Sequence, residues 1–444
     1  MSGVLSFQEK LTREFNTFEG NLNGQAQSSI HMLRQQAMKR FVELGFPTIR
    51  HEEWRYTNLF PVLQHEYEIM LQSPSQLTQA DIEPFLLPHT DANIIVLVNG
   101  VYVQALSRLV SSSDALQVMP LAEALKRKPM LIEQHFARYA AWQDDAMVAL
   151  NTAFSVQGVY IEVAPKAVIE EPIHLISVND AQRCHTFIPM RHLITIGAGA
   201  EVSIVETTST FCAEQYASLT HSVSEILLAH NASLHLYMLQ NDREHAHCVH
   251  NTHVYQEAHS TFRSIVITLS GGLVRNTLNT VLAGHGADAH LYGLYLVEDK
   301  TLVDNHTCVE HAVAHCTSNE LYKGVLDGSA TGVFNGKIIV RPHAQKTLAY
   351  QSNRNILLSR AASIHTKPQL EIFADDVKCS HGCTSGQLDD EALFYLRARG
   401  LGQERAQALL LYAFAGEMTE KIDLEPLREH VESVIAARLH QERD

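Results

Sequence analysis

The sequence lacks the features that would place the chain in a membrane. No run of about 18 uncharged apolar residues, the length that a transmembrane helix requires, occurs anywhere in it. The first ten residues, MSGVLSFQEK, contain no apolar stretch long enough for a signal peptide. We therefore expect no membrane contact and a cytoplasmic location.

Basic residues are also scarce. Lys and Arg number 34 against 49 Asp and Glu, which gives a net charge of −15, and no run of basic residues interrupts this pattern. Proteins that bind phosphate backbones carry basic faces. Nucleic acid is therefore not an expected partner.

A further absence concerns nucleotide chemistry. The chain contains no Walker-type loop, in which a glycine-rich turn ending in Gly-Lys-Ser/Thr holds phosphates. Any ATP used in its function must then be hydrolysed by a partner. This absence fits a non-catalytic scaffold.

Cysteine is sparse, whereas histidine is abundant. The seven cysteines are scattered from Cys184 to Cys383, and an odd number without an export signal indicates free thiols in a reducing compartment. The 26 histidines suggest metal binding. We expect instead that most of them occupy solvent-facing strand or turn positions.

Residues 1–155 read as a mostly helical region with one hairpin. Apolar residues in 28–44 recur with helical spacing, and Gly45 ends that helix. Asn99-Gly100 between two apolar runs predicts a hairpin with a type I′ turn. Two further helices are expected near 119–140 and 143–153.

Residues 156–386 have a different texture. Short alternating runs such as Val159–Val163 and Lys337–Val340 predict strands. Small residues punctuate them at intervals of roughly 30 to 45 residues, as at Gly197–Ala200, Gly284–Ala287 and Asp327–Ala330. A sandwich, a barrel and a solenoid all remain possible, and the recurrent small corners favour the solenoid.

Residues 387–444 return to helical periodicity. Asp389 or Asp390 is a suitable N-cap for the segment 391–399, and Gly400 supplies its end. Further helices are expected at about 403–415 and from about 424. The predicted fold is therefore mixed and mainly β, with helical regions on both sides.

The densest group of chemically capable residues comes just before this helical tail. Cys379, His381 and Cys383 could offer thiolate and imidazole ligands to iron or zinc. Lys378 and a protonated His381 would lower the Cys379 pKa. Three ligands within five residues rarely complete a tetrahedral site, so a tight turn between strand and helix is an equally open interpretation.

Several sequence blocks decide between these interpretations. From about 320 to 415 the chain closely resembles the SufB/SufD family of iron–sulfur cluster assembly scaffolds. The matching blocks are Phe334–Ile338, Gln351–Ser359, Lys367–Ile372, Asp375–Gly382 and Phe394–Gly400. Weaker matches lie at Gly293–Tyr295, Asp304 and Glu52–Thr57.

The resemblance implies a central right-handed parallel β-helix between N-terminal and C-terminal helical regions. It also implies a complex with a SufB-type paralogue and a SufC-type ATPase, and the isolated chain could form a homodimer. Cys379 and His381 would lie at the interface with the paralogue, where transient iron or a nascent cluster is handled. No tightly bound cofactor is expected in the isolated chain.

The resemblance also assigns further residues. Residues 389–415 would form the ATPase-docking surface, which includes Asp390, Phe394, Tyr395, Arg397 and Arg399. Cys383 departs from the family, which usually has alanine there. It is either an additional ligand or a small residue that fills the same space.

Three alternatives remain. The absence of cysteine before Cys184 and the short chain favour the SufD branch, but a SufB-like scaffold that holds the cluster itself is possible. A β-helix enzyme acting on carbohydrate would need convergent catalytic groups and is generally secreted. A metal-dependent enzyme centred on Cys379, His381 and Cys383 is the third alternative.

Overall fold

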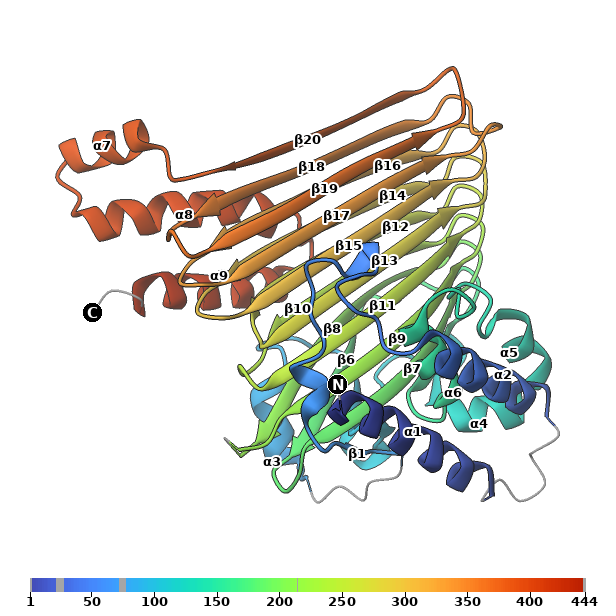
Figure 1. The fold of residues 1–444 in the computed structure, drawn as a ribbon. Coiled ribbons are helices and arrows are strands. Elements are labelled where there is room, and N and C mark those ends of the chain that lie inside the picture. The colour runs from blue at the N-terminus through green and yellow to red at the C-terminus, as the bar shows by residue number, and fades with distance from the viewer. Residues whose placement is uncertain (1, 21–27, 72–76, 214, 442–444) are drawn as a thin grey trace.

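The computed structural model describes residues 2–20, 28–71, 77–213 and 215–441 (Figure 1). The N-terminal region combines helices with short strands. Its helices are α1 (Ser2–Gly20), α2 (Ser29–Leu44), α3 (Gln79–Ile82), α4 (Leu121–Arg127), α5 (Pro129–His135) and α6 (Ala146–Ala153). Its strands are β1 (Glu68–Ile69), β2 (Asn93–Val98), β3 (Val101–Tyr102) and β4 (Leu116–Pro120).

A long series of parallel strands forms the centre of the molecule. The strands of one sheet are β5 (Val159–Val163), β7 (Thr186–Ile196), β9 (Ser218–Leu228), β11 (Ala246–Gln256), β13 (Leu273–Leu282), β15 (Leu302–His311), β17 (Thr331–Val340) and β19 (Ser363–Ile372). Those of the other are β6 (Ile173–Ala181), β8 (Glu201–Cys212), β10 (Ser233–Asn241), β12 (Thr261–Ser270), β14 (Asp288–Val297), β16 (Thr317–Leu326), β18 (Leu348–Leu357) and β20 (Lys378–Gly386). Successive strands alternate between the two sheets, so each coil adds one strand to each. The predicted solenoid is confirmed as a parallel β-helix.

The pairing register explains why the repeat was irregular in the sequence. Thr261 pairs with Asp288, Asp288 with Thr317, and Thr317 with Leu348, which are steps of 27, 29 and 31 residues. The small-residue segments noted in the sequence occur at two different kinds of bend, one after each sheet. Gly197–Ala200 follows a strand of the first sheet, whereas Asp327–Ala330 follows a strand of the second.

The N-terminal region covers the first coil. The predicted hairpin is confirmed, because β2 and β3 pair across a turn in which Asn99 and Gly100 both have positive φ (49° and 80°). Strand β2 continues the sheet beside β6, and β4 pairs with β5. The helix expected over 119–140 is instead strand β4 followed by two short helices, since Pro129 begins a new helix and cannot continue α4.

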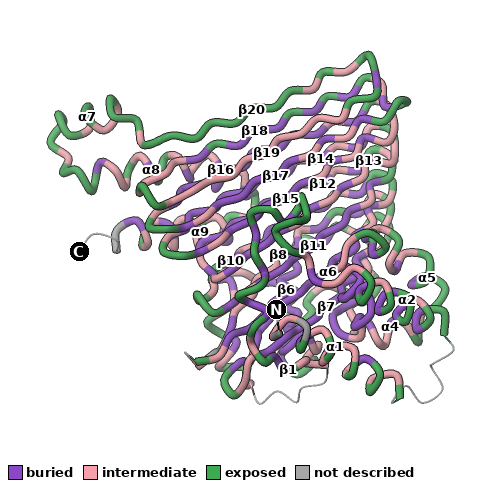
Figure 2. Tube along the Cα trace, viewed as in Figure 1, coloured by how far each residue is buried: buried purple, intermediate pink, exposed green. Residues whose placement is uncertain are grey.

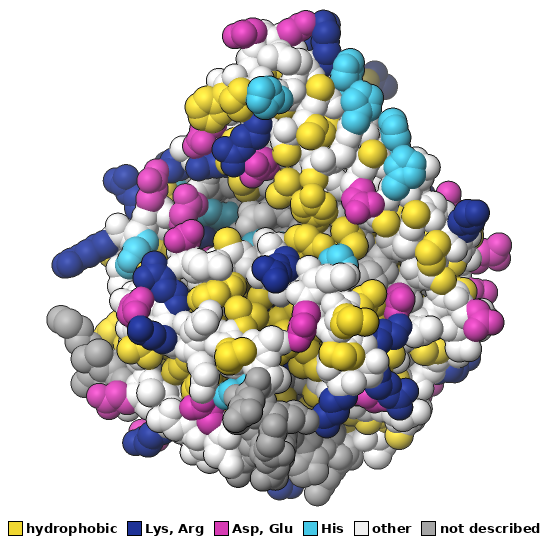
Figure 3. Space-filling model, turned by 90° about the vertical axis from the view of Figure 1, so that its right-hand side faces the viewer, with side chains coloured by type: hydrophobic (Ala, Val, Ile, Leu, Met, Phe, Trp, Pro, Cys, Tyr) yellow, Lys and Arg dark blue, Asp and Glu magenta, His cyan; other side chains and the backbone are white. Residues whose placement is uncertain are grey.

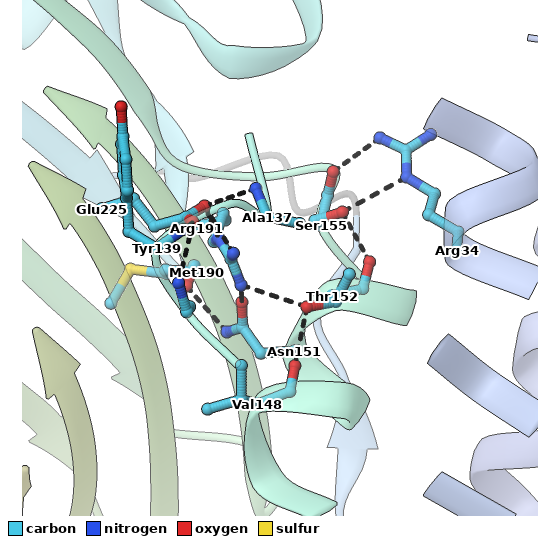
Figure 4. Close-up of polar contacts among 11 residues, drawn as sticks. Arg34, Ala137, Tyr139, Val148, Asn151, Thr152, Ser155, Met190, Arg191 and Glu225 are labelled. Carbon is cyan, nitrogen blue, oxygen red and sulfur yellow. Dashed lines mark hydrogen bonds and ion pairs between the residues drawn. The ribbon is translucent and has the colours of Figure 1, made fainter. Parts of the chain in front are cut away.

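A buried ion pair fixes α6 and the preceding loop to the first sheet (Figure 4). Arg191 and Glu225 have fully buried side chains, and Arg191 Nη2 lies 2.5 Å from Glu225 Oε2. Glu225 also accepts hydrogen bonds from the backbone N–H groups of Ala137 and Ala140, and Arg191 donates to Thr152 Oγ1. Buried charges of this kind require complete pairing, so both elements are held in one position.

Two C-terminal helices pack on the outer face of the second sheet. Helices α8 (Gln403–Thr419) and α9 (Glu425–Gln441) bury Leu411, Val431 and Ile435 in a cluster with Leu321 and Val325 of β16. Helix α7 (Asp390–Ala398) precedes them and has no buried residue. Among the described residues, no helix has the length and apolarity needed to cross a membrane.

The opposite end of the β-helix is uncovered. Strands β19 and β20 are the last of their sheets, and no described strand pairs with their outer edges. Figure 2 shows the change along the axis, from buried lower coils to an exposed β20 at the top. We call β19, β20 and the bend between them the open end.

Candidate functional site

Cys379, His381 and Cys383 lie on β20 and face the interior of the β-helix at the open end. Their register partners on β18 are Ala349, Gln351 and Asn353, all buried. Cys379 packs against an apolar cluster that contains Ala349. Because no further coil covers this layer, interior positions become an accessible surface here.

The spacing of the three side chains limits what they can bind together. Alternate residues of an extended strand lie about 7 Å apart, so Cys379 and Cys383 are about 13 Å apart along β20. Within the described residues no three His, Cys, Asp or Glu side chains are placed to hold one metal ion. The segment is thus neither a tight turn nor a compact cluster, but a line of three separated side chains.

One expectation about Cys379 needs revision. Lys378 lies on the opposite face of β20, because side chains alternate along a strand, so its ammonium group does not face the Cys379 thiol as expected. Burial instead raises the pKa of the Cys379 thiol. Cys383 is exposed, and its Sγ lies 3.0 Å from Thr366 Oγ1 of β19. Both thiols therefore face the gap between the last two strands.

Polar residues continue beneath this layer. Gln351 pairs in register with His381 above it and with Glu320 below it. Glu320 Oε1 accepts a hydrogen bond from Gln351 Nε2 (3.3 Å), and Glu320 Oε2 accepts one from Thr307 Oγ1 (2.5 Å). Burial raises the pKa of Glu320 to about 7. These contacts could not be predicted from the sequence, because they join residues 13 and 31 positions apart whose pairing only the coil register sets.

The predicted docking residues lie on and beside α7. Phe394 and Tyr395 are 74% and 57% exposed, and the Arg399 guanidinium lies 5.0 Å from the centre of the Tyr395 ring. Asp390 and Arg397 belong to the same exposed helix, which Asp389 caps. Asp389 is one of the two residues, Asp389 and Asp390, that the sequence offered as the N-cap of this helix. The helix presents large apolar side chains with no neighbour to bury them among the described residues.

An N-terminal loop lies against the outer face of the first sheet near the open end. The Trp54 ring lies 3.9 Å from the Arg275 guanidinium, and Glu53 contacts His306 at 3.2 Å. Tyr56 stacks on His365 of β19 with ring centres 4.0 Å apart. The loop corresponds to the weakly matching block Glu52–Thr57, whose structural role the sequence did not reveal.

Charges hold this loop in place. Asp304 pairs with Arg275, and although burial alone would raise its pKa, the guanidinium keeps it low, at about 2. Glu52 pairs with Lys367 on β19. The His306 imidazole likewise holds the pKa of Glu53 below its usual value. The loop thus connects the N-terminal region to one strand of the open end.

Some histidines lie at turns, as expected, whereas others are buried. A line of them follows the corners of successive coils, visible at the upper right of Figure 3, and its members are His230, His259, His285 and His315. Eight others are buried, which the sequence did not predict: His31, His174, His192, His221, His250, His253, His306 and His311. Apolar alternation in a strand does not indicate which polar residues the interior accepts.

Comparison with known proteins identifies the family. A model described as "SUF system FeS cluster assembly, SufBD core domain" matches residues 177–414, and the "SufBD protein N-terminal region" matches 5–175. The chain belongs to the SufB/SufD family. The resemblance inferred from the blocks around Cys379 is therefore confirmed, and so is a role in iron–sulfur cluster assembly.

Two of the relatives cover nearly the whole chain, and a third covers part of it. The iron–sulfur cluster assembly protein SufD of Escherichia coli is 30% identical over 416 residues, or 91% of this chain and 92% of that protein. A SufBD-family protein of Synechocystis is 29% identical over 94% of this chain and 93% of its own length. One of Mycobacterium leprae is 38% identical over 41% of this chain and 48% of its own length. The match to SufD agrees with the branch of the SufB/SufD family predicted from the cysteine pattern.

Proposed function

We propose that this chain is a non-catalytic scaffold subunit whose open end joins a SufB-type paralogue around a nascent iron–sulfur cluster. The observation that carries the proposal is the position of Cys379, His381 and Cys383 on the inner face of an uncovered last coil. Each can offer one ligand, and together they cannot complete a site. A second chain on this surface would supply the others.

The edges of the open end suit such a partner. An uncovered strand presents unpaired N–H and C=O groups that readily pair with a strand of another chain. Exposed apolar side chains accompany them at Leu348, Tyr350, Ile372 and Phe373. Without the paralogue, a second copy of this chain could pair with the same edges.

Helix α7 suits the second partner, a SufC-type ATPase. Exposed aromatic side chains beside arginines are typical anchors of protein interfaces. Phe394 and Tyr395 provide the aromatic surface. On α8, the next helix in the chain, Leu409 and Tyr412 are also exposed, at 48% and 38%. Because α8 also packs on β14 and β16, movement of the bound ATPase would be transmitted to the β-helix.

The chemistry of the line suits iron as cargo rather than as a permanent cofactor. A thiol whose pKa is raised releases its proton only when a metal replaces it, and the affinity then depends on pH. Separate thiol and imidazole ligands hold a metal weakly until a partner contributes more. The free thiols of six of the seven cysteines support a cytoplasmic location.

The test is reconstitution with both partners. We expect His381→Ala to leave the three-protein complex intact while lowering the yield of iron–sulfur cluster. Ser380→Ala, on the same strand but facing outward, is the matched control and should behave as the wild type. A normal cluster yield from His381→Ala, or failure of the wild-type chain to bind either partner, would contradict the proposal.

A further inference from the structure

The layer beneath His381 contains a polar acceptor that has no donor. Gln351 is 3% exposed, and its Nε2 donates a hydrogen bond to the Glu320 carboxyl group. This bond turns the amide oxygen of Gln351, Oε1, away from the carboxyl group. Gln351 Oε1 has no hydrogen-bond partner among the described residues. A buried acceptor left without a donor destabilises the fold, so its position calls for an explanation.

The register of the last coils places a candidate donor, His381, beside this oxygen. His381 is the register partner of Gln351 on β20, and both side chains face the interior. Neighbouring strands lie about 4.8 Å apart, so an amide oxygen and an imidazole N–H on paired residues are within reach of each other. The second ring nitrogen of His381 would then point toward the open surface.

The surroundings hold Gln351 in this position. Glu320 is 1% exposed and is itself fixed by Thr307, so the carboxyl group keeps Gln351 Nε2 on the side away from β20. Gly336 of β17 makes the space, because a Cβ atom at that position would collide with Gln351 Nε2. Gly336 belongs to one of the blocks that identified the family, and this contact gives a physical reason for glycine there.

We propose that Gln351, anchored by Glu320, is a positioning residue that accepts the N–H of His381 and presents the other ring nitrogen to iron. The inference rests on the proposed function of His381 as a ligand. Residues that hold a ligating imidazole fix its tautomer and direction, and their loss typically costs 10–100-fold in metal affinity. Neither Gln351 nor Glu320 would touch the metal.

The direct test is the tautomer of His381 in the chain labelled with ¹⁵N-histidine, with its signals assigned by their loss in His381→Ala. One tautomer should dominate in the wild type and in Gln351→Glu, which keeps an acceptor. Gln351→Leu should give a mixture, and so should Gly336→Ala, which displaces the side chain without removing the amide. Gln240→Leu removes another buried glutamine far from the open end and should leave the signals unchanged.

The functional readout uses Co²⁺ as a spectroscopic probe in the complex with the paralogue. Gln351→Leu should weaken Co²⁺ binding about 10–100-fold, and Gln351→Leu combined with His381→Ala should be no weaker than His381→Ala alone. An unchanged tautomer in Gln351→Leu would overturn the positioning role even if His381 is a ligand. Normal Co²⁺ binding and cluster yield in His381→Ala would instead overturn the proposed function, whatever the tautomer.

Discussion

The two ends of the β-helix are built from the same kind of strand but are finished in opposite ways. At the N-terminal end, β2 and β4 extend both sheets over the first coil, and a buried ion pair fixes α6 against it. At the open end, β19 and β20 have uncovered edges, and ion pairs such as Lys346–Asp376 are exposed. One end is completed within the chain, whereas the other leaves its last two strands without a neighbour among the described residues.

The largest expected effect concerns the N-terminal end. Arg191→Leu leaves the Glu225 carboxylate buried without its partner and should lower the free energy of unfolding by about 3–5 kcal/mol. Urea denaturation measures this. The double variant with Glu225→Gln, which removes the buried charge but keeps an acceptor for the N–H groups of Ala137 and Ala140, should be less destabilised than the single one. A loss below about 1 kcal/mol in the single variant would contradict the assigned role.

Proline substitutions at neighbouring positions of β20 test its two edges one at a time, the edge that pairs with β18 and the edge that is uncovered. Lys378 N–H donates to Thr347, so alternation directs the N–H of Thr384 toward β18 and that of Ser385 toward the open edge. Thr384→Pro should destabilise the free chain by about 1–3 kcal/mol. Ser385→Pro should leave its unfolding nearly unchanged and weaken binding to the paralogue, as isothermal titration would show. Equal unfolding curves for the two variants would contradict the assigned edge.

Acid should destabilise the N-terminal half in particular. Burial lowers the pKa of His174, His192 and His221 to about 3. The unfolded chain then binds more protons below pH 6.5, so stability is lost as the pH falls from there, by about 2 kcal/mol for each histidine by pH 5. Glu320 has the opposite effect on the pH dependence of stability. Burial raises its pKa to about 7, so its neutral carboxyl group favours the folded state at low pH, and this stabilisation is lost as the pH rises through 7.

His221 tests this pH dependence most simply. Within the described part of the chain neither of its ring nitrogens has a hydrogen-bond partner, so His221→Leu removes the proton linkage without leaving a polar group behind. The variant should lose less stability than the wild type between pH 6.5 and 5 in thermal unfolding. His343→Ala, at an exposed corner, serves as the control and should keep the wild-type slope; a wild-type slope in His221→Leu would count against a buried neutral imidazole.

The smallest effect on stability is expected at α7. Phe394→Ala should change the free energy of unfolding by no more than about 0.5 kcal/mol, because the side chain is 74% exposed. It should nevertheless weaken ATPase binding by about 2 kcal/mol, as expected for an aromatic anchor. Ser385→Pro should leave ATPase binding intact, so the two variants distinguish the two partner surfaces. Full ATPase affinity in Phe394→Ala would remove α7 from the docking surface.

The sequence predicted the elements that depend on local signals. Asn99-Gly100 indicated a hairpin, Gly45 the end of a helix, and short runs of β-forming residues a series of strands, because turn and strand preferences are local. The small-residue corners favoured the solenoid, and the family blocks located the candidate site. What could not be predicted depends on contacts between segments far apart in the sequence: the Arg191–Glu225 contact, the position of Gln351 between His381 and Glu320, and the burial of eight histidines.

The same limit explains the revised expectations about the site. Cys379, His381 and Cys383 are so close in the sequence that they look like one compact cluster. In the structure they are spread along an extended strand. Lys378 appears adjacent to Cys379, and alternation places it on the opposite face. Only the strand assignment reveals that the three side chains share a face and that this face is uncovered.

Hydrogen exchange of the β20 backbone tests most directly whether the open end is a partner surface. The peptide covering residues 378–386 should exchange rapidly in the free chain, because its outer edge is unpaired, and should become protected when the SufB-type paralogue is added. The peptide covering β7, residues 186–196, should be protected equally in both states. Unchanged exchange in 378–386 upon formation of a stable complex would contradict the account.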